Sequence, residues 1–184
     1  MLVEFSVANY RSFRDETTLS MVAGKRKSRE RQLDTQATFE VEQLDSRLLK
    51  CAAIYGANSA GKSNLFQALQ FFKKFVLESA NADDIDAEID SKPFALNNYS
   101  SAEPSKFWVI FVSNSTTYEY GFSVNTQSVV EEWLLSKSAK ATRSIELFSR
   151  EANNFKFHKN FKESALKNSF SGQGRVHGTG FELG

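Results

Sequence analysis

The sequence predicts an α/β fold in which one buried strand, a glycine-rich loop and one amphipathic helix stand beside an antiparallel β region. An almost continuous apolar stretch runs from Leu48 to Tyr55 and stops at a glycine, which is typical of a strand covered on both faces. The next residues, Gly56–Ser63, fit the pattern Gly, four residues, Gly, Lys, Ser. Much of the remaining chain alternates apolar and polar residues, which indicates antiparallel strands.

Composition narrows the class of protein. The 184 residues include 41% apolar residues and 17 Phe, with 23 Lys and Arg against 22 Asp and Glu, which is enough apolar material for a folded core. Cys51 is the one cysteine, so no intrachain disulfide can form and a reducing compartment is expected. No apolar run approaches the ~18 residues of a membrane-spanning helix, and no signal-peptide pattern opens the chain. We therefore expect a cytoplasmic protein with no membrane partner.

Three regions are expected along the chain. Residues 1–80 hold N-terminal strands, the glycine-rich loop and the helix that follows it, and residues 81–160 hold an acidic loop and an antiparallel β meander. Residues 161–184 form an irregular tail, because five of the nine glycines fall there without a periodic apolar pattern. We expect the chain to be the truncated N-terminal part of a larger core.

The elements follow from two periodicities. Period-2 alternation predicts an edge or half-buried strand at residues 2–8 and further strands at residues 17–22, 38–44, 107–113, 117–124, 129–135 and 145–149, with a last alternating pair at Phe155 and Phe157. Asn114 and Ser115 mark the turn of the clearest hairpin. From Lys62 to about Ala80 the apolar residues recur at helical spacing, which predicts a helix with one broad apolar face.

The glycine-rich loop carries the chemistry. Gly56 and Gly61 let backbone amides approach phosphate oxygens, Lys62 supplies a positive charge for the β and γ phosphates, and the Ser63 hydroxyl is a ligand for Mg²⁺. A strand before the loop and a helix after it would direct helix N-terminal amides at an anion. A turn that merely starts a helix would explain the two glycines but not the Lys-Ser pair. The predicted ligands are ATP and Mg²⁺, held by Gly56, Ala57, Asn58, Ser59, Ala60, Gly61, Lys62 and Ser63.

Several segments resemble known ATPases. Phe5–Phe13 resembles the first strand and the Asn-Phe/Tyr-Arg/Lys-Ser-Phe turn of the SMC, RecF and OLD group of ABC-class ATPases. Ile54–Leu69, Tyr118–Phe122 and Glu131–Leu134 resemble AAA-type, OLD-like bacterial ATPases found among abortive-infection and phage-resistance proteins. The resemblance covers most of residues 1–160. It implies an incomplete P-loop NTPase of the ABC-ATPase type, with a P-loop strand and helix plus an antiparallel β subdomain.

The resemblance also implies a role for Arg11, since the basic residue of this turn lies near the nucleotide in that group. The alternative for Arg11 is an exposed charge at the end of a strand. Two such ATPase heads close around ATP as a homodimer, and the complete proteins act on DNA or on a defence effector. These partners are implied for this chain by resemblance only.

Other parts of an ATPase are not found in the sequence. Hydrolysis needs an apolar strand that ends in an Asp for Mg²⁺, usually followed by a Glu, and Val129–Glu132 imitates this with two apolar residues and no Asp. Phe170–Gln173 echoes part of the ABC signature, but no helical pattern follows it. No catalytic residue is therefore assigned. We expect ATP binding with little turnover, and a non-catalytic nucleotide-binding or interaction module left by truncation is the alternative.

A basic run gives a test that is independent of the loop. Lys25, Arg26, Lys27, Arg29 and Arg31 lie within seven residues and either follow a nucleic-acid backbone or form a solvated hairpin tip. If they contact phosphates, DNA binding should weaken steeply with salt, and changing all five to Ser should flatten that dependence because fewer counterions are released. Salt-titrated DNA binding of the two proteins measures this, and equal slopes would refute the contact.

Overall fold

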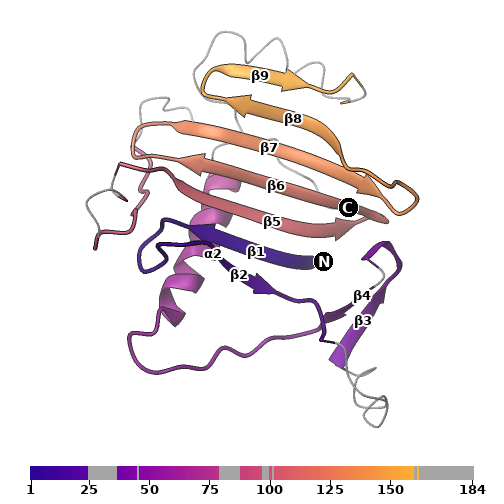
Figure 1. The fold of residues 1–184 in the computed structure, drawn as a ribbon, viewed down its shortest axis with the longest axis horizontal. Coiled ribbons are helices and arrows are strands. Elements are labelled where there is room, and N and C mark those ends of the chain that lie inside the picture. The colour runs from indigo at the N-terminus through magenta and orange to yellow at the C-terminus, as the bar shows by residue number, and fades with distance from the viewer. Residues whose placement is uncertain are drawn as a thin grey trace.

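The computed structural model describes residues 1–24, 37–44, 46–78, 88–96, 100, 102–159 and 161 (Figure 1). The predicted basic run, most of the acidic loop and nearly all of the predicted tail lie outside these residues. Among the described residues there are two sheets, one α-helix and a short 3-10 helix. Their bounds are β1 Leu2–Ala8, β2 Thr17–Ser20, β3 Thr38–Val41, η2 Glu42–Leu44, β4 Ser46–Leu49, α2 Lys62–Glu78, β5 Ser105–Ser113, β6 Thr116–Val124, β7 Val129–Ser138, β8 Ile145–Glu151 and β9 Asn154–Phe157.

Seven strands form one antiparallel sheet in the order β2-β1-β5-β6-β7-β8-β9. The run from β5 to β9 is a meander, as the alternating sequence predicts. The β5–β6 hairpin turns at Asn114 and Ser115, whose φ angles of 45° and 59° are those of a tight turn that matches the twist of the strands. β1 lies between β2 and β5, so it is an interior strand and not an edge.

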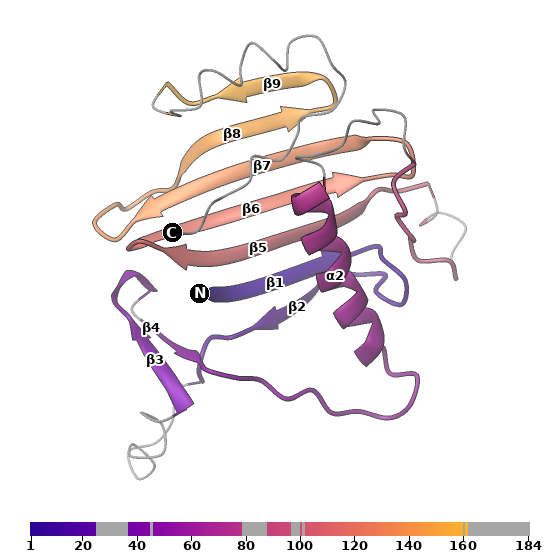
Figure 2. The ribbon, with the colours of Figure 1, turned by 180° about the vertical axis from the view of Figure 1, so that it is seen from behind.

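Helix α2 crosses one face of this sheet (Figure 2). Its Leu65 and Ala68 are buried, and Phe71, Phe72 and Phe75 pack on rings from three strands. Among the rings of the described residues, the closest pair joins Phe75 of α2 to Phe122 of β6, with centroids 4.0 Å apart. The sheet side of this core is formed by Phe5, Val7, Phe107, Phe122 and Val124. The predicted helical stripe is therefore confirmed as the face that the helix buries.

Both tryptophans of the chain lie on the opposite face of the sheet, since they pair with Gly121, whose neighbour Phe122 packs on α2. No described helix lies over this face (Figure 1). Gly121 of β6 is paired with Trp108 on one side and Trp133 on the other. A Cβ atom at Gly121 would lie 2.2 Å from the Trp133 ring and 2.6 Å from Cβ of Trp108. Glycine is needed here because the Trp133 ring covers the bare backbone of the middle strand.

Strands β3 and β4 form a separate two-stranded ladder. Val41 and Leu48 from this hairpin pack with Val3 of β1 and Val112 of β5 in a second, smaller core. The hairpin is therefore attached to the end of the large sheet by side-chain packing, with isolated backbone contacts such as Ala23 N to Arg47 O at 2.8 Å.

The strand predicted from Leu48 to Tyr55 is wrong over most of its length. β4 ends at Leu49, and residues 51–57 have no strand pairing in the part of the chain that the structure describes. All seven are exposed, with Tyr55 at 90%. An apolar stretch becomes a buried strand only where neighbouring strands supply backbone partners and a covering layer, and the described residues supply neither here.

Within the described ranges, no helix has both the length and the hydropathy needed to cross a membrane.

The packing around Gly121 predicts a stability change. Gly121→Ala should lower the free energy of unfolding by about 1–3 kcal/mol, because the added methyl group must displace the Trp133 ring or the backbone beside it. Gly24→Ala is the matched control, since a Cβ there meets nothing within 4 Å. Urea unfolding of the three proteins measures the difference, and equal midpoints for both variants would contradict it.

Candidate functional site

The predicted loop lies at the N-terminal end of α2 and faces solvent. Residues 51–60 are all exposed, and Gly61 adopts a φ of +89° immediately before the first helical residue, Lys62. Ser59 also has a positive φ of 65°, and Ala60 N donates to Ala57 O at 3.2 Å. Because the first amides of a helix have no acceptor within it, this junction presents donors and a positive dipole end to solvent.

Lys62 is folded back over the loop. Its Nζ donates to Gly56 O at 2.7 Å and to Ala57 O at 2.6 Å. The loop carbonyls thus satisfy the ammonium group, while Ser63, the predicted Mg²⁺ ligand, is exposed on the first turn of α2. Amides, an ammonium group and a hydroxyl are the donor set that a triphosphate with Mg²⁺ requires, so the residues fit that ligand.

The turn after β1 packs against the end of this loop. Tyr10 and Phe13 exchange backbone hydrogen bonds of 2.8 Å, which closes the turn and leaves Ser12 at its tip. Asn64 Nδ2 donates to Ser12 Oγ at 2.8 Å, and a Cβ on Gly61 would lie 3.0 Å from the same oxygen. The turn and the loop are therefore in direct contact, through side chains whose roles the sequence did not reveal.

Arg11, the predicted nucleotide contact, lies in the same turn with a φ of 52°. Its Nε donates to Tyr10 Oη at 3.3 Å, and its guanidinium lies 5.6 Å from the centre of the Tyr10 ring. The Arg11 backbone N donates to Lys92 O at 2.7 Å. The side chain is thus held at the turn by Tyr10, next to Ser12 in sequence.

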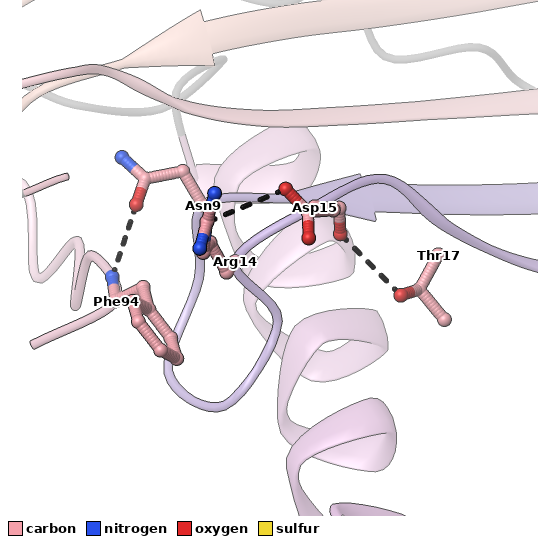
Figure 3. A network of polar contacts seen from close by, with 5 residues as sticks. All are labelled: Asn9, Arg14, Asp15, Thr17 and Phe94. Carbon is pink, nitrogen blue, oxygen red and sulfur yellow. Dashed lines mark hydrogen bonds and ion pairs between the residues drawn. The ribbon is translucent and has the colours of Figure 1, made fainter. Parts of the chain in front are cut away.

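Asn9 anchors the base of the turn (Figure 3). It is only 8% exposed and has a φ of 49°. Its Nδ2 donates to Ser100 O and Glu103 O, both at 2.8 Å, and its Oδ1 accepts from Phe94 N at 3.1 Å. One amide side chain thus connects β1 to the segment that precedes β5. A sequence signal for this role exists only in the preference of Asn for left-handed backbone at the end of a strand.

A hollow of about 510 Å³ lies at the base of the same turn. Its lining includes Asn9, Arg14, Glu103, Lys106, Ser123 and Glu131 and contains no residue of Gly56–Ser63. Charges of both signs line it, and Lys106 pairs with Glu131 at 3.6 Å. The hollow is therefore separate from the predicted phosphate site.

The sequence at Val129–Glu132, the nearest imitation of a metal-binding strand, belongs to β7 of the antiparallel meander. Glu131 is exposed and faces Lys106, whereas Glu132 is buried on the face that carries Phe122 and accepts a hydrogen bond of 2.8 Å from Tyr120 Oη. The two carboxylates thus point to opposite faces and do not share a ligand. Within the described part of the chain, no group of three or more His, Cys, Asp or Glu residues could hold a metal ion.

Glu132 is nevertheless electrostatically unusual. Burial raises its pKa from 4.5 to about 7, against the opposing effects of the Tyr120 hydrogen bond and of Arg150, its buried cross-strand neighbour. Burial and the Glu132 charge also raise the pKa of Tyr120 well above its usual value. The cost of a buried carboxylate here is thus only partly offset by its neighbours.

This shift predicts how stability depends on pH. The folded state holds the Glu132 proton more tightly than the unfolded state does. Protonated Glu132 therefore contributes fully to the free energy of unfolding below about pH 4.5, and this contribution is lost as the pH rises to about 7. Relative to Glu132→Gln, the free energy of unfolding of the natural protein should fall by up to roughly 3 kcal/mol across this range. Urea unfolding from pH 4.5 to 8 measures it. Glu131→Gln, an exposed neighbour, should keep the natural pH dependence, and a parallel course for Glu132→Gln would be inconsistent with the shift.

One family of known proteins matches the part of the chain that contains the loop. No curated protein matches the chain. A family model described as "AAA domain, putative AbiEii toxin, Type IV TA system" matches residues 51–177, which begin just before the loop and include α2 and the meander. The match spans more than two thirds of the chain and bears out the P-loop, AAA-type part of the predicted resemblance. The chain belongs to this AAA domain family.

Proposed function

We propose that this chain binds Mg-ATP at the junction of the Gly56–Ser63 loop and the N-terminus of α2. The observation that carries the proposal is the exposed loop with Lys62 folded over its carbonyls, in a chain of the AAA domain family. In the bound state the loop amides and the Lys62 ammonium would hold phosphate oxygens, and the Ser63 hydroxyl would hold Mg²⁺. Lys62 must exchange its two carbonyl acceptors for phosphate when this happens.

The assignment to a particular class of ATPase depends on residues outside the loop. The turn Asn9–Phe13, which resembles that of OLD, RecF and SMC ATPases, lies before the segment that the family model matches. We take it as support for an ABC-class ATPase in which Arg11 leaves the Tyr10 ring to contact the nucleotide. From the same resemblance come a homodimer of ATPase heads and the coupling of ATP binding and hydrolysis to DNA-related or anti-phage activity. The family description, which names a toxin and a type IV toxin–antitoxin system, is compatible with a defence role.

Removal of the lysine tests ATP binding. Lys62→Ala should weaken Mg-ATP binding by at least about tenfold, because a charge-assisted contact to phosphate contributes roughly 1.5–3 kcal/mol. Lys73→Ala is the matched control, since it removes the same charge from an exposed position further along α2. Equilibrium titration with a fluorescent ATP analogue and Mg²⁺ gives the affinities.

Phosphate release from the same samples separates binding from catalysis. The sequence predicts binding without appreciable turnover. Turnover that Lys62→Ala abolishes would show that the chain does supply catalytic carboxylates. Equal affinity in the natural protein and Lys62→Ala, or no Mg-ATP binding by the folded protein, would contradict the proposed site.

A further inference from the structure

The tip of the turn after β1 reaches the first turn of α2, just after the loop, by a side-chain hydrogen bond. Asn64 lies in the first turn of α2, two residues after Lys62, and its Nδ2 donates to Ser12 Oγ at 2.8 Å. The two residues are 52 positions apart in sequence, so the bond joins elements that are distant along the chain.

The same hydroxyl oxygen lies against the last glycine of the loop. A Cβ on Gly61 would come within 3.0 Å of Ser12 Oγ and 3.9 Å of the Phe13 ring. Gly61 also has a φ of +89°, so the turn fills the space beside the loop at the point where its backbone reverses into the helix. The Ser12 hydroxyl therefore lies beside the Gly61 backbone, at the point where the loop joins α2.

The turn itself is firmly held. Backbone hydrogen bonds join Tyr10 to Phe13 and Asn9 N to Arg14 O, and the buried Tyr10 ring contacts Phe71 of α2 and Phe107 of β5. Ser12 thus lies in a turn that packs against both the sheet and the helix. An exposed side-chain hydrogen bond adds little to the free energy of unfolding. When one of its partners lies in a well-packed turn, however, the bond can restrict the conformations of the adjacent loop.

We propose that Ser12 is a positioning residue for the phosphate loop: with Asn64 it fixes the first turn of α2 so that the amides after Gly61 are preorganised for phosphate. This inference rests on the proposed ATP site and extends it to a residue outside the loop. Preorganisation reduces the ordering that binding must supply, so loss of the bond reduces affinity without removing a contact to the ligand.

A double-mutant cycle tests the proposal. Ser12→Ala and Asn64→Ala should each weaken Mg-ATP binding roughly 3- to 10-fold, the range expected for one neutral hydrogen bond, and the double variant should be no weaker than the weaker single variant. Ser12→Thr keeps the hydroxyl and should bind nearly as the natural protein does. Ser20→Ala is the matched control, because Ser20 Oγ donates to Glu4 Oε1 at 3.0 Å on β2 and does not contact the loop.

Urea unfolding of the same variants distinguishes positioning from a structural role. The proposal expects unchanged midpoints, whereas a fall in stability that parallels the fall in affinity would overturn it. It is also overturned if Lys62→Ala abolishes binding while Ser12→Ala and Asn64→Ala bind normally, or if the two losses add fully in the double variant. Unchanged binding by Lys62→Ala would instead reject the ATP site itself, and this inference with it.

Discussion

The contact between the Phe75 ring of α2 and the Phe122 ring of β6 fixes the helix on the sheet, and the position of the loop depends on it. Phe72 lies beside them, with its centroid 5.4 Å from that of Phe122 and 5.8 Å from that of Phe5. Such ring clusters combine a large buried area with preferred geometries, so they fix both the position and the rotation of a helix on a sheet. Because α2 begins at the loop, the place where the loop lies follows from this packing.

The loop is therefore held from its helical side. Residues 51–57 have no strand pairing among the described residues, whereas Leu65 N donates to Gly61 O and the turn after β1 lies against Gly61. Asn9 and Arg11 both adopt left-handed backbone in that turn, which costs free energy in residues with a Cβ, although less in Asn than in Arg. Hydrogen bonds from Asn9 to the segment before β5 offset part of this cost. The large sheet thus supports both α2 and the turn after β1, the two elements that meet at Gly61.

The parts of the fold that depend on local determinants are predictable from the sequence. Period-2 alternation located the strands of the meander, helical spacing located α2, and the motif located the loop, since each is written in consecutive residues. Leu48–Tyr55 failed because an apolar stretch reports what a strand would bury but not whether a neighbouring strand is present. Ser12 and Asn9 could not be assigned, because their contacts join residues 52 or more positions apart. Their geometry depends on the assembled sheet and helix.

The placement of the aromatic and thiol side chains gives the molecule two separate optical reporters. Trp108 and Trp133 flank Gly121 on the face of the sheet opposite α2, so tryptophan emission senses the sheet and not the loop. Cys51 is the one cysteine in the sequence, is exposed, and precedes Gly56 by five residues. A thiol-reactive dye would therefore label the loop side at a single position. Energy transfer from the tryptophans to that dye would follow movement of the loop relative to the sheet without any engineered residue.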